Sequence, residues 1–532
     1  MSMSRLARSL PALIAGHSRT RPNAIAVECV DTGEKISWAE LHRRSLVWAD
    51  ALQRAGVHPS QTVATLLPTQ PVAYEVWLGC AWLKAIEVPI NPEYRGEWLV
   101  EALTQSRAET LVISSRYLPH LATVLAELQG ISTFIVVDGA GQEALPKLTR
   151  GRVLDGRALL AAATPLNEPA PPEAWDVACI IFTSGTTGAV KGVIMPWGLI
   201  LSGSESTTRP SLYDDVIFYS WYAPYHLTGK GALNIAALKN GRLVLRERFS
   251  ASQFWPDIRQ HGCTATILMG ISASHIYQQP PDPGDADNSL RVVLMTPVLP
   301  QVDEFKKRFD IEVVTTYGST EVSAALVSHM RPVSSANARS CGRPDPEGDY
   351  EIQLVDEHDY AVAPGAVGEM VVRPRAPWTA NLGYFGMPEA TVAAWRNGWY
   401  HTGDAFFVDA QGDWFFVDRI TDTIRRRGEL ISSFAIEQAA NRHPDVLESA
   451  AVAVRADAGE DEVKLVVVAK PGRSLDPLAL LDFLAPNVPK FAMPRFVEIV
   501  AELPKTQATL RVQKTKLRER GVTAATWDRS QL

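Results

Sequence analysis

Cysteine is scarce in this sequence, with five residues in a chain of 532. The five lie far apart, and their spacing matches neither a zinc site nor a disulfide framework. We therefore expect reduced, buried thiols, the usual state in a cytoplasmic enzyme, and no metal bound through cysteine. The residues are Cys29, Cys80, Cys179, Cys263 and Cys341.

Long apolar runs and excess positive charge are also missing. No uninterrupted apolar stretch reaches the length that a membrane span requires, and the N-terminus shows no convincing cleavage signal. The formal net charge is −7, which argues against broad electrostatic binding to nucleic acid or to an anionic membrane. A polyanionic ligand would therefore have to be held by local cations.

The length and patterning that are present indicate an α/β protein. A chain of 532 residues is too long for one core and should divide into at least two domains. Helical and strand patterns alternate in the first part, which predicts layered, mostly parallel sheets covered by helices. The expected helices are 38–55 and 73–83, and the expected strands are 63–67, 110–113 and 133–137.

The pattern changes late in the chain, where a strand-rich stretch begins at Gly368. We predict a large N-terminal domain over residues 1–417, a small mobile α+β domain over residues 418–532, and a hinge near 418–422. In the small domain we expect helices at 435–443 and 477–484 and strands at 450–454 and 464–468.

The densest chemical signal is the segment 182–192, Phe-Thr-Ser-Gly-Thr-Thr-Gly-Ala-Val-Lys-Gly. Its glycines let backbone N–H groups turn toward an anion, its hydroxyls add donors, and its lysine adds a point charge. A buried-strand pattern at 177–181 precedes it, which disfavours an ordinary surface loop. The glycine spacing is not that of a Walker loop. The predicted phosphate-binding residues are Thr183, Ser184, Gly185, Thr186, Thr187, Gly188 and Lys191.

Further motifs accompany this loop along nearly the whole chain. They are Ala-Pro-Tyr-His at 223–226, Tyr-Gly-Ser-Thr-Glu at 317–321, Gly-Tyr at 383–384 with Pro-Glu-Ala-Thr at 388–391, Tyr-His-Thr-Gly-Asp at 400–404 and Asp-Arg at 418–419. With these motifs the chain resembles the adenylate-forming superfamily of acyl-CoA synthetases, peptide-synthetase adenylation domains and luciferases. Within the acyl-CoA synthetase branch it resembles crotonobetaine/carnitine–CoA ligases and long- and medium-chain acyl-CoA synthetases. That family activates a carboxylate with ATP as an acyl-adenylate and passes the acyl group to a thiol.

The resemblance implies a role for each motif residue. Thr320 would hydrogen-bond the α-phosphate, Glu321 would hold Mg²⁺, and Asp404 would accept hydrogen bonds from the ribose hydroxyls. His226 would lie between the acyl site and the thiol channel, and a packing histidine is the alternative. The other nucleotide-binding residues would be Tyr317, Gly318, Ser319 and Arg419. The acyl pocket would be lined by Tyr225, Gly229, Gly231, Met269, Gly270 and Val322.

In this family the C-terminal domain rotates between the two half-reactions, delivering a catalytic lysine from one face and building the coenzyme A tunnel with the other. Residues 425–430 match the tunnel-side loop. Gly428 would leave room for the pantetheine arm, and Arg425, Arg426 and Arg427 would meet the phosphates of coenzyme A. A solvated basic hairpin is the alternative interpretation.

The tail departs from the family pattern, Leu-Pro-Lys-Thr followed shortly by Gly-Lys. Leu510 or Arg511 occupies the place of the catalytic lysine, and Lys514 lies a few residues too late. Loss of one preorganised charge-stabilising donor costs on the order of 10²–10³ in rate, so adenylation should suffer. A second departure is Met295-Thr296-Pro297-Val298, where relatives usually have Gly-Gly-Ala-Pro.

We therefore predict an acid–thiol ligase specialised for turning a preformed acyl-adenylate, supplied by a separate adenylating enzyme, into the CoA thioester. The alternatives are a complete ATP-dependent ligase with Arg511 or Lys514 standing in, and a non-catalytic relative that binds acyl-adenylate or nucleotide. A carrier-loading adenylation domain is less favoured, because no carrier segment follows. The expected ligands are Mg²⁺, ATP or acyl-adenylate, coenzyme A, and a bulky or branched carboxylic acid of secondary metabolism. We expect a cytoplasmic monomer or homodimer without nucleic-acid or membrane partners.

Overall fold

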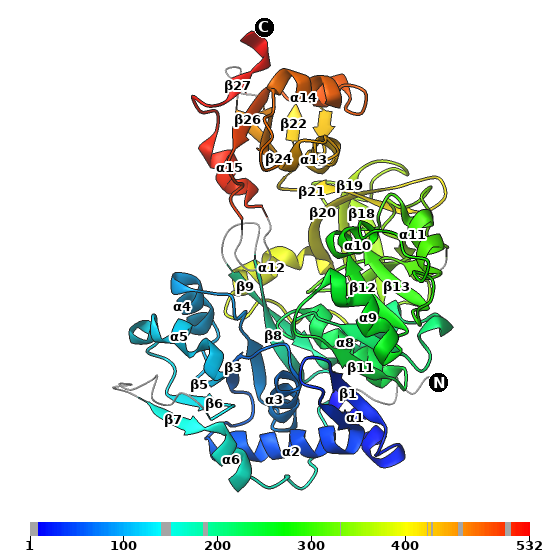
Figure 1. Cartoon of the computed structure of the whole chain (residues 1–532). Helices are drawn as coiled ribbons and strands as arrows, with labels where there is room; N and C mark the ends of the chain where they lie inside the picture. The colour runs from blue at the N-terminus through cyan, green and yellow to red at the C-terminus, as the bar shows by residue number, and fades with distance from the viewer. Residues whose placement is uncertain are drawn as a thin grey trace. The chain divides into compact units, whose positions relative to one another are not determined.

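The computed structural model describes residues 9–139, 151–184, 190–329, 331–422, 424–426, 429–455, 461–505 and 512–531. The chain forms two compact units, each built from separate stretches of sequence (Figure 1). The first comprises Met1–Thr183, Val190–Ile352 and Val372–Gly398, and the second comprises Ser184–Ala189, Gln353–Val371 and Trp399–Leu532. The boundary at residue 417 and the hinge at 418–422 stay predictions.

Two seven-stranded sheets frame the first unit. One has the order β14-β13-β12-β10-β11-β1-β2 and is parallel except for the pair β1 and β2. The other has the order β7-β6-β5-β3-β4-β8-β9 and is parallel from β7 to β8. The strands are β1 (Ile25–Cys29), β2 (Lys35–Ser37), β3 (Thr62–Leu66), β4 (Ile86–Pro89), β5 (Thr110–Ile113), β6 (Thr133–Val136), β7 (Arg152–Asp155), β8 (Val177–Ser184), β9 (Val190–Pro196), β10 (Ile217–Ser220), β11 (Arg242–Leu245), β12 (Ala265–Met269), β13 (Val292–Thr296) and β14 (Glu312–Val314).

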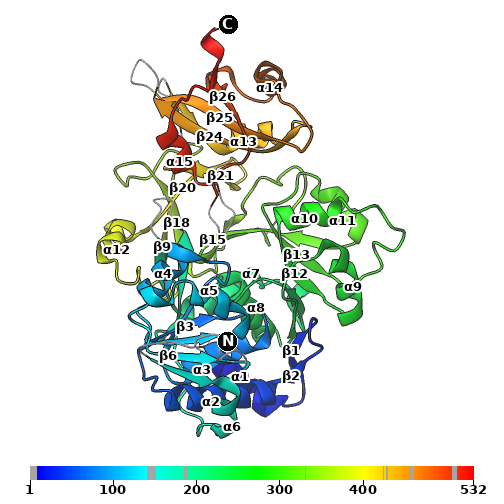
Figure 2. The same cartoon turned by 60° about the vertical axis from the view of Figure 1, so that its left-hand side comes forward.

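A layer of helices lies between these sheets. The main hydrophobic cluster joins apolar residues of β1, β10 and β11 in one sheet to residues of β8 and β9 in the other, through helices α1, α3, α7 and α8. Figures 1 and 2 show α3 and α8 between β3 on one side and β12 on the other. The helices are α1 (Leu10–Thr20), α2 (Trp38–Arg54), α3 (Pro71–Trp82), α4 (Gly96–Gln105), α5 (Leu118–Ala122), α6 (Gly156–Ala162), α7 (Trp197–Thr207), α8 (Leu227–Leu238), α9 (Ala251–His261), α10 (Gly270–Tyr277), α11 (Val302–Phe309) and α12 (Pro388–Ala394).

Further hydrophobic clusters cover the other faces. Helices α9, α10 and α11 pack on the first sheet around residues such as Phe254, Phe305 and Phe309. Helices α2 and α6 complete the second sheet's cluster, which includes Trp48 and Trp82. Sheets covered on both faces produce nearly continuous apolar strands, which is why the sequence pattern predicted a parallel architecture correctly.

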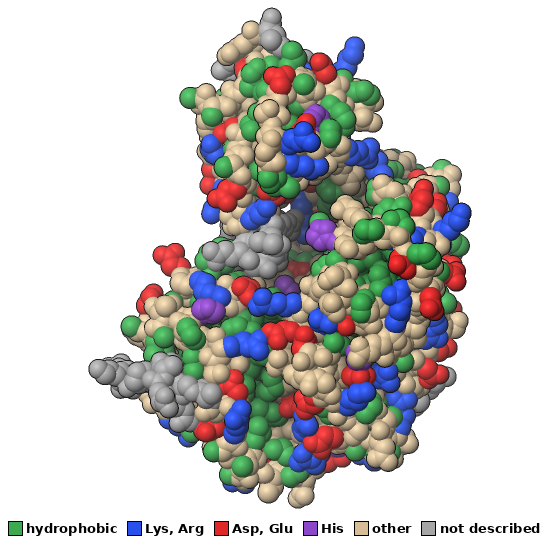
Figure 3. Space-filling view, viewed as in Figure 1, with side chains coloured by type: hydrophobic (Ala, Val, Ile, Leu, Met, Phe, Trp, Pro, Cys, Tyr) green, Lys and Arg blue, Asp and Glu red, His purple; other side chains and the backbone are tan. Residues whose placement is uncertain are grey.

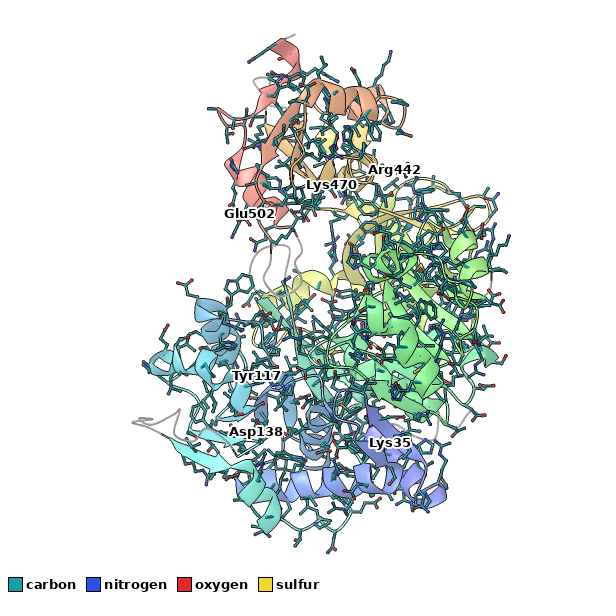
Figure 4. All side chains as sticks on the ribbon, viewed as in Figure 1. Lys35, Tyr117, Asp138, Arg442, Lys470 and Glu502 are labelled. Atoms are coloured by element: carbon teal, nitrogen blue, oxygen red, sulfur yellow. The ribbon has the colours of Figure 1, made fainter. Side chains whose placement is uncertain are left out.

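Smaller sheets lie wholly or partly in the second unit, since the unit boundaries after Ile352 and Val371 fall within two of their strands. They have the orders β18-β19-β20-β21, β22-β23 and β24-β25-β26-β27. The last is covered by α13 and α14 over an apolar cluster that includes Ile436, Leu465 and Leu481. Lys470, labelled in Figure 4, follows β25 and donates a hydrogen bond to Pro444 O (2.6 Å). The elements are β18 (Tyr350–Val355), β19 (Gly368–Pro374), β20 (Tyr400–Val408), β21 (Trp414–Arg419), β22 (Ile424–Arg426), β23 (Glu429–Ile431), α13 (Ser433–Ala440), β24 (Val446–Arg455), β25 (Asp461–Ala469), α14 (Pro477–Leu484), β26 (Phe496–Val500), α15 (Lys514–Arg520) and β27 (Trp527–Asp528).

The predicted fold class is confirmed, and the predicted elements match observed ones to within a few residues. The expected helix 477–484 is α14, and the expected helix 435–443 begins two residues earlier, as α13 (Ser433–Ala440). The earlier start follows from Ser432, whose side chain accepts a hydrogen bond from Ala435 N and caps the helix. On the face in Figure 3, acidic and basic side chains are interspersed. No helix among the described residues has the length and apolar character of a membrane span.

One buried ion pair joins the helical layer to the second sheet. Lys230 of α8 contacts the carboxylate of Glu87 of β4, and both side chains are almost fully buried. Thr65 Oγ1 donates to the other Glu87 oxygen (2.9 Å), and the Lys230 ammonium lies 4.0 Å from the ring centroid of Trp77. Since a buried charge without a partner is costly, each member depends on the other.

We predict that Glu87→Gln lowers the free energy of unfolding by about 3–5 kcal/mol, because Lys230 would keep a buried charge without its counter-ion. The double variant Lys230→Met with Glu87→Gln should recover most of this loss, since glutamine still accepts from Thr65. Denaturant unfolding followed by fluorescence measures both. Glu351→Gln, in an exposed pair with Arg373, is the control and should change stability by less than about 1 kcal/mol. Equal stability of Glu87→Gln and wild type would contradict the prediction.

Candidate active site

The predicted phosphate loop leaves the end of a buried strand. Cys179, Ile180 and Ile181 of β8 are fully or almost fully buried, which confirms the strand that the sequence predicted before the loop. Thr183 Oγ1 donates to Lys191 O (3.3 Å) and so links β8 to β9 across the base of the loop. Gly185, Thr186, Thr187 and Gly188 lie outside the described residues, and of Ser184 only the backbone is described.

Three residues from distant parts of the sequence, Lys191, Glu321 and Tyr384, lie close together. Tyr384 donates its hydroxyl hydrogen to Glu321 Oε1 (3.0 Å). The ammonium of Lys191 lies 4.9 Å from the centroid of the Tyr384 ring, within the range of a cation–π contact. Tyr384 therefore links the lysine of the loop to the carboxylate of the Tyr-Gly-Ser-Thr-Glu motif.

Backbone pairing with β9 brings Tyr384 to this place. Leu382 N donates to Ile194 O (2.9 Å), and Phe385 N donates to Gly192 O (2.7 Å). Gly383 has φ +110°, and a Cβ on it would lie 2.6 Å from Thr391 Cγ2, so glycine is required. The sequence showed this Gly-Tyr pair as a family segment but gave no sign that the tyrosine reaches Glu321.

A tight hairpin presents Thr320 and Glu321. They lie in the turn between β15 (Thr316–Ser319) and β16 (Ser323–Val327), and both are half-buried. Ser319 Oγ accepts from Glu321 N (3.2 Å) and fixes the turn. A Cβ on Gly318 would lie 1.7 Å from Ser323 O, which explains the glycine. β17 (Arg343–Pro344) pairs with β16 and completes this sheet, and Tyr317 lies half-buried on β15.

Asn381, which lies outside the hairpin in sequence, hydrogen-bonds to the same turn. Its backbone N and its side-chain Nδ2 donate to Glu321 O at 2.8 and 3.2 Å. Glu321 thus has a fixed backbone and one oriented oxygen, and no Lys or Arg pairs with its carboxylate among the residues that the structure describes. The described residues include no group of three or more His, Cys, Asp or Glu that could hold a metal.

His226 directly precedes α8, and its ring centroid lies 4.4 Å from that of Tyr225. Burial lowers the pKa of His226 from 6.5 to about 4, because the charged imidazole loses solvation. Burial, chiefly, raises the pKa of Tyr225 to about 12. Both side chains are therefore uncharged near neutral pH.

The predicted acyl-pocket glycines differ in the space around them. A Cβ on Gly229 would lie 2.1 Å from Ala223 O, so this glycine serves close packing, and its carbonyl accepts from Tyr74 OH (2.8 Å). A Cβ on Gly270 would lie 3.0 Å from Pro297 O, whereas Gly231 has only Ser204 Oγ within 4 Å, at 3.8 Å. Two further predicted pocket residues are not glycines: Val322 is fully buried, and Met269 is the last residue of β12.

In the second unit, Asp404 and Arg419 are cross-strand partners on β20 and β21. Arg419 Nε lies 2.7 Å from Asp404 Oδ1, and Arg419 Nη1 donates to Thr402 O (3.4 Å). Asp404 is buried. The structure therefore places together two residues for which the family resemblance implies nucleotide binding.

Of the four predicted tunnel-side residues, 425–428, the structure describes the side chain of Arg426 alone. Arg426 is buried, lies 2.8 Å from Glu462 Oε2 and donates to Phe491 O (2.9 Å), so its guanidinium is used inside this unit. The side chain of Arg425 is not described, and Arg427 and Gly428 lie outside the described residues.

Arg511 also lies outside the described residues, but Lys514 at the start of α15 does not. Lys514 Nζ lies 2.8 Å from Glu437 Oε1 and 2.5 Å from Ser433 Oγ. Burial raises the pKa of Glu437, and Lys514 acts in the opposite direction. This lysine is therefore held by partners in its own unit.

Comparisons with known proteins agree with this arrangement. The sequence profile described as "AMP-binding enzyme" matches residues 15–385, and that of the "AMP-binding enzyme C-terminal domain" matches residues 435–509. A crotonobetaine/carnitine–CoA ligase of Citrobacter koseri is 29% identical over 478 residues, covering 88% of this chain and 91% of that protein. The corresponding ligase of Proteus mirabilis is 30% identical over 479 residues, with the same coverage.

Solved structures show the same fold. A benzoate CoA ligase from Burkholderia xenovorans LB400 superposes with a TM-score of 0.80 at 24% identity, covering 96% of this chain and 99% of the other. Since a family profile spans most of the sequence and a relative is 30% identical over 88% of it, the chain belongs to the AMP-binding enzyme family, the ligase family that its motifs predict.

Proposed function

We propose that this protein forms a CoA thioester from a carboxylic acid through an acyl-adenylate, and that it is adapted to the second, thioester-forming half of that reaction. The observation that supports this specialisation is that no free lysine is found at the catalytic position near the C-terminus among the described residues or in the sequence motif. Leu510 or Arg511 stands where the family has its catalytic lysine, and Lys514, a possible substitute, is held by Glu437 and Ser433.

The nucleotide side of the proposed reaction is supported, in the first unit, by the contacts of Tyr384 with Lys191 and Glu321. In the first half-reaction a carboxylate oxygen attacks the α-phosphorus of ATP and pyrophosphate leaves. In the second, the thiol sulfur of coenzyme A attacks the acyl carbon and AMP leaves. Lys191 and Thr320 would orient the phosphate, and Asp404 would accept from the ribose hydroxyls. The chain's contribution is then positioning and charge stabilisation, without a protein nucleophile.

The carboxylate of Glu321 suits Mg²⁺. Magnesium in nucleotide enzymes is usually held by one or two carboxylates together with substrate phosphates and water, and Glu321 offers one oriented carboxylate with no competing cation among the described residues. When bound, the ion would neutralise phosphate charge. Tyr384 would keep Glu321 in the orientation that binding requires.

The other two proposed substrates are coenzyme A and the carboxylic acid. The named relatives act on crotonobetaine or carnitine, and the space beside Gly231 is compatible with a bulky or branched acid. Arg426 is left out of the proposed contacts with coenzyme A because Glu462 and Phe491 O already engage it.

We predict that wild-type protein forms thioester from a synthetic acyl-adenylate at least about 100-fold faster than from acid plus ATP, because the first half-reaction lacks its lysine. Arg511→Lys should raise pyrophosphate release on the order of 10²-fold and leave the second half-reaction unchanged. Leu510→Lys makes the same test for the alignment in which Leu510 occupies the place of the catalytic lysine. A panel of acids and their adenylates that includes carnitine and crotonobetaine, followed by mass spectrometry, also identifies the substrate.

Two outcomes would overturn this assignment. Equal rates from adenylate and from acid plus ATP would show a complete ligase. Tight adenylate binding with no thioester from any acid of the panel would favour the non-catalytic alternative.

We predict that Tyr384→Phe weakens the binding of Mg²⁺–ATP about tenfold, since a hydrogen bond to a charged group contributes about 1.5–3 kcal/mol. The variant keeps the ring beside Lys191 and removes the hydroxyl that donates to Glu321. Titration calorimetry measures the affinity with and without Mg²⁺, and the loss should appear only with the metal. Tyr213→Phe is the matched control, because the buried Tyr213 hydroxyl has no hydrogen-bond partner in the described structure. An equal loss without Mg²⁺ would contradict the proposed role.

The neutral imidazole of His226 gives a pH prediction. Because its folded pKa, about 4, lies below the ordinary 6.5, the unfolded chain binds the proton first as pH falls. Relative to His226→Asn, wild-type stability should therefore be constant above pH 7 and decrease from about pH 6.5 to about pH 4. Thermal unfolding of both proteins across this range measures the difference, in which the other histidines cancel. A difference that does not change with pH would show that His226 is solvated.

A further inference from the structure

Glu369 of β19 reaches the motif that carries Asp404. Its Oε1 accepts from Gly403 N (2.9 Å), and its Oε2 lies 3.0 Å from His401 Nδ1. The side chain of His401 is 5% exposed, and its Nε2 lies 3.7 Å from Asp359 Oδ1. One carboxylate therefore holds both the imidazole and the backbone directly before Asp404.

The backbone around Gly403 is fixed from both sides. Thr402 Oγ1 donates to Met370 O (2.7 Å) and accepts from Asp404 N (3.1 Å). On the other side, Ile420 N donates to Gly403 O (2.8 Å). Gly403 has φ +70°, a left-handed conformation that is easy only for glycine. Without Glu369, this turn would lose the acceptor of the Gly403 N–H.

We propose that Glu369, with His401, is a positioning residue for ribose recognition, acting through the Gly403 backbone on the carboxylate of Asp404. The inference rests on the proposed function, in which Asp404 accepts from the ribose hydroxyls. Two neighbours already restrain Asp404: its backbone N–H is bonded to Thr402, and Arg419 Nε lies 2.7 Å from Oδ1. Glu369 supplies a further restraint, on the peptide from which Asp404 projects.

The test compares AMP with 2′,3′-dideoxy-AMP by titration calorimetry on the full chain. Wild type should bind AMP at least about tenfold more tightly, and Asp404→Ala should abolish this preference. Glu369→Ala should reduce the preference to within about threefold of that of Asp404→Ala, while its affinity for the dideoxy nucleotide stays near the wild-type value. Glu369→Gln should keep most of the preference, because an amide oxygen can still accept from Gly403 N–H.

Glu351→Ala removes a carboxylate from β18 in the same sheet, where it pairs with the exposed Arg373, and should change neither affinity. An unchanged preference in Glu369→Ala, whatever its thermal stability, would overturn the inference and leave Glu369 a structural residue. If Glu369→Ala does not fold, His401→Asn decides: a preference within twofold of wild type overturns the inference. A preference that survives in Asp404→Ala would instead show that the ribose assignment is wrong.

Discussion

The buried contact between Lys230 and Glu87 is the constraint on which the first unit's site depends. Helix α8 packs on the sheet that contains β10 and β11, whereas Glu87 lies on β4, next to β8 of the other sheet. The ion pair therefore fixes the helix that follows His226 relative to the strand that leads into the phosphate loop. Because neither charge can be left alone in an apolar interior, the two sheets cannot shift past each other at this point without separating the pair.

Short backbone pairings also bring side chains from distant parts of the sequence into the site. Tyr384 lies almost two hundred residues after Lys191, yet its segment pairs with β9 through an antiparallel bridge between Val193 and Tyr384 and adjacent backbone hydrogen bonds. The conformation of Gly383 and the packing of Thr391 make this path specific. An enzyme that works by orientation needs rigid support behind each polar group, and here that support is mostly hydrogen-bonded backbone.

Much of the fold could be predicted from sequence because its strands and helices have strong local patterns. The apolar run before the loop, the period of the helix at 38–55 and the alternation in the small domain all matched observed elements. Contacts between distant residues have no such local pattern. Nothing near Arg426 in sequence indicates that Glu462 will engage it, and nothing near Lys514 indicates Glu437. The same applies to Gly229, since nothing near it in sequence indicates that a Cβ there would meet Ala223 O.

The second unit is assembled from separate stretches of sequence, including Gln353–Val371 and the region from Trp399 onward. This has a consequence for recombination between related genes. A single crossover near residue 418 would combine Glu369, His401 and Asp404 from one parent with Arg419 from the other, and so divide the cross-strand pair between two ancestries. Exchanges that keep Glu369, His401, Asp404 and Arg419 together must fall after residue 419 or before residue 369, which limits how freely such a tail can be inherited on its own.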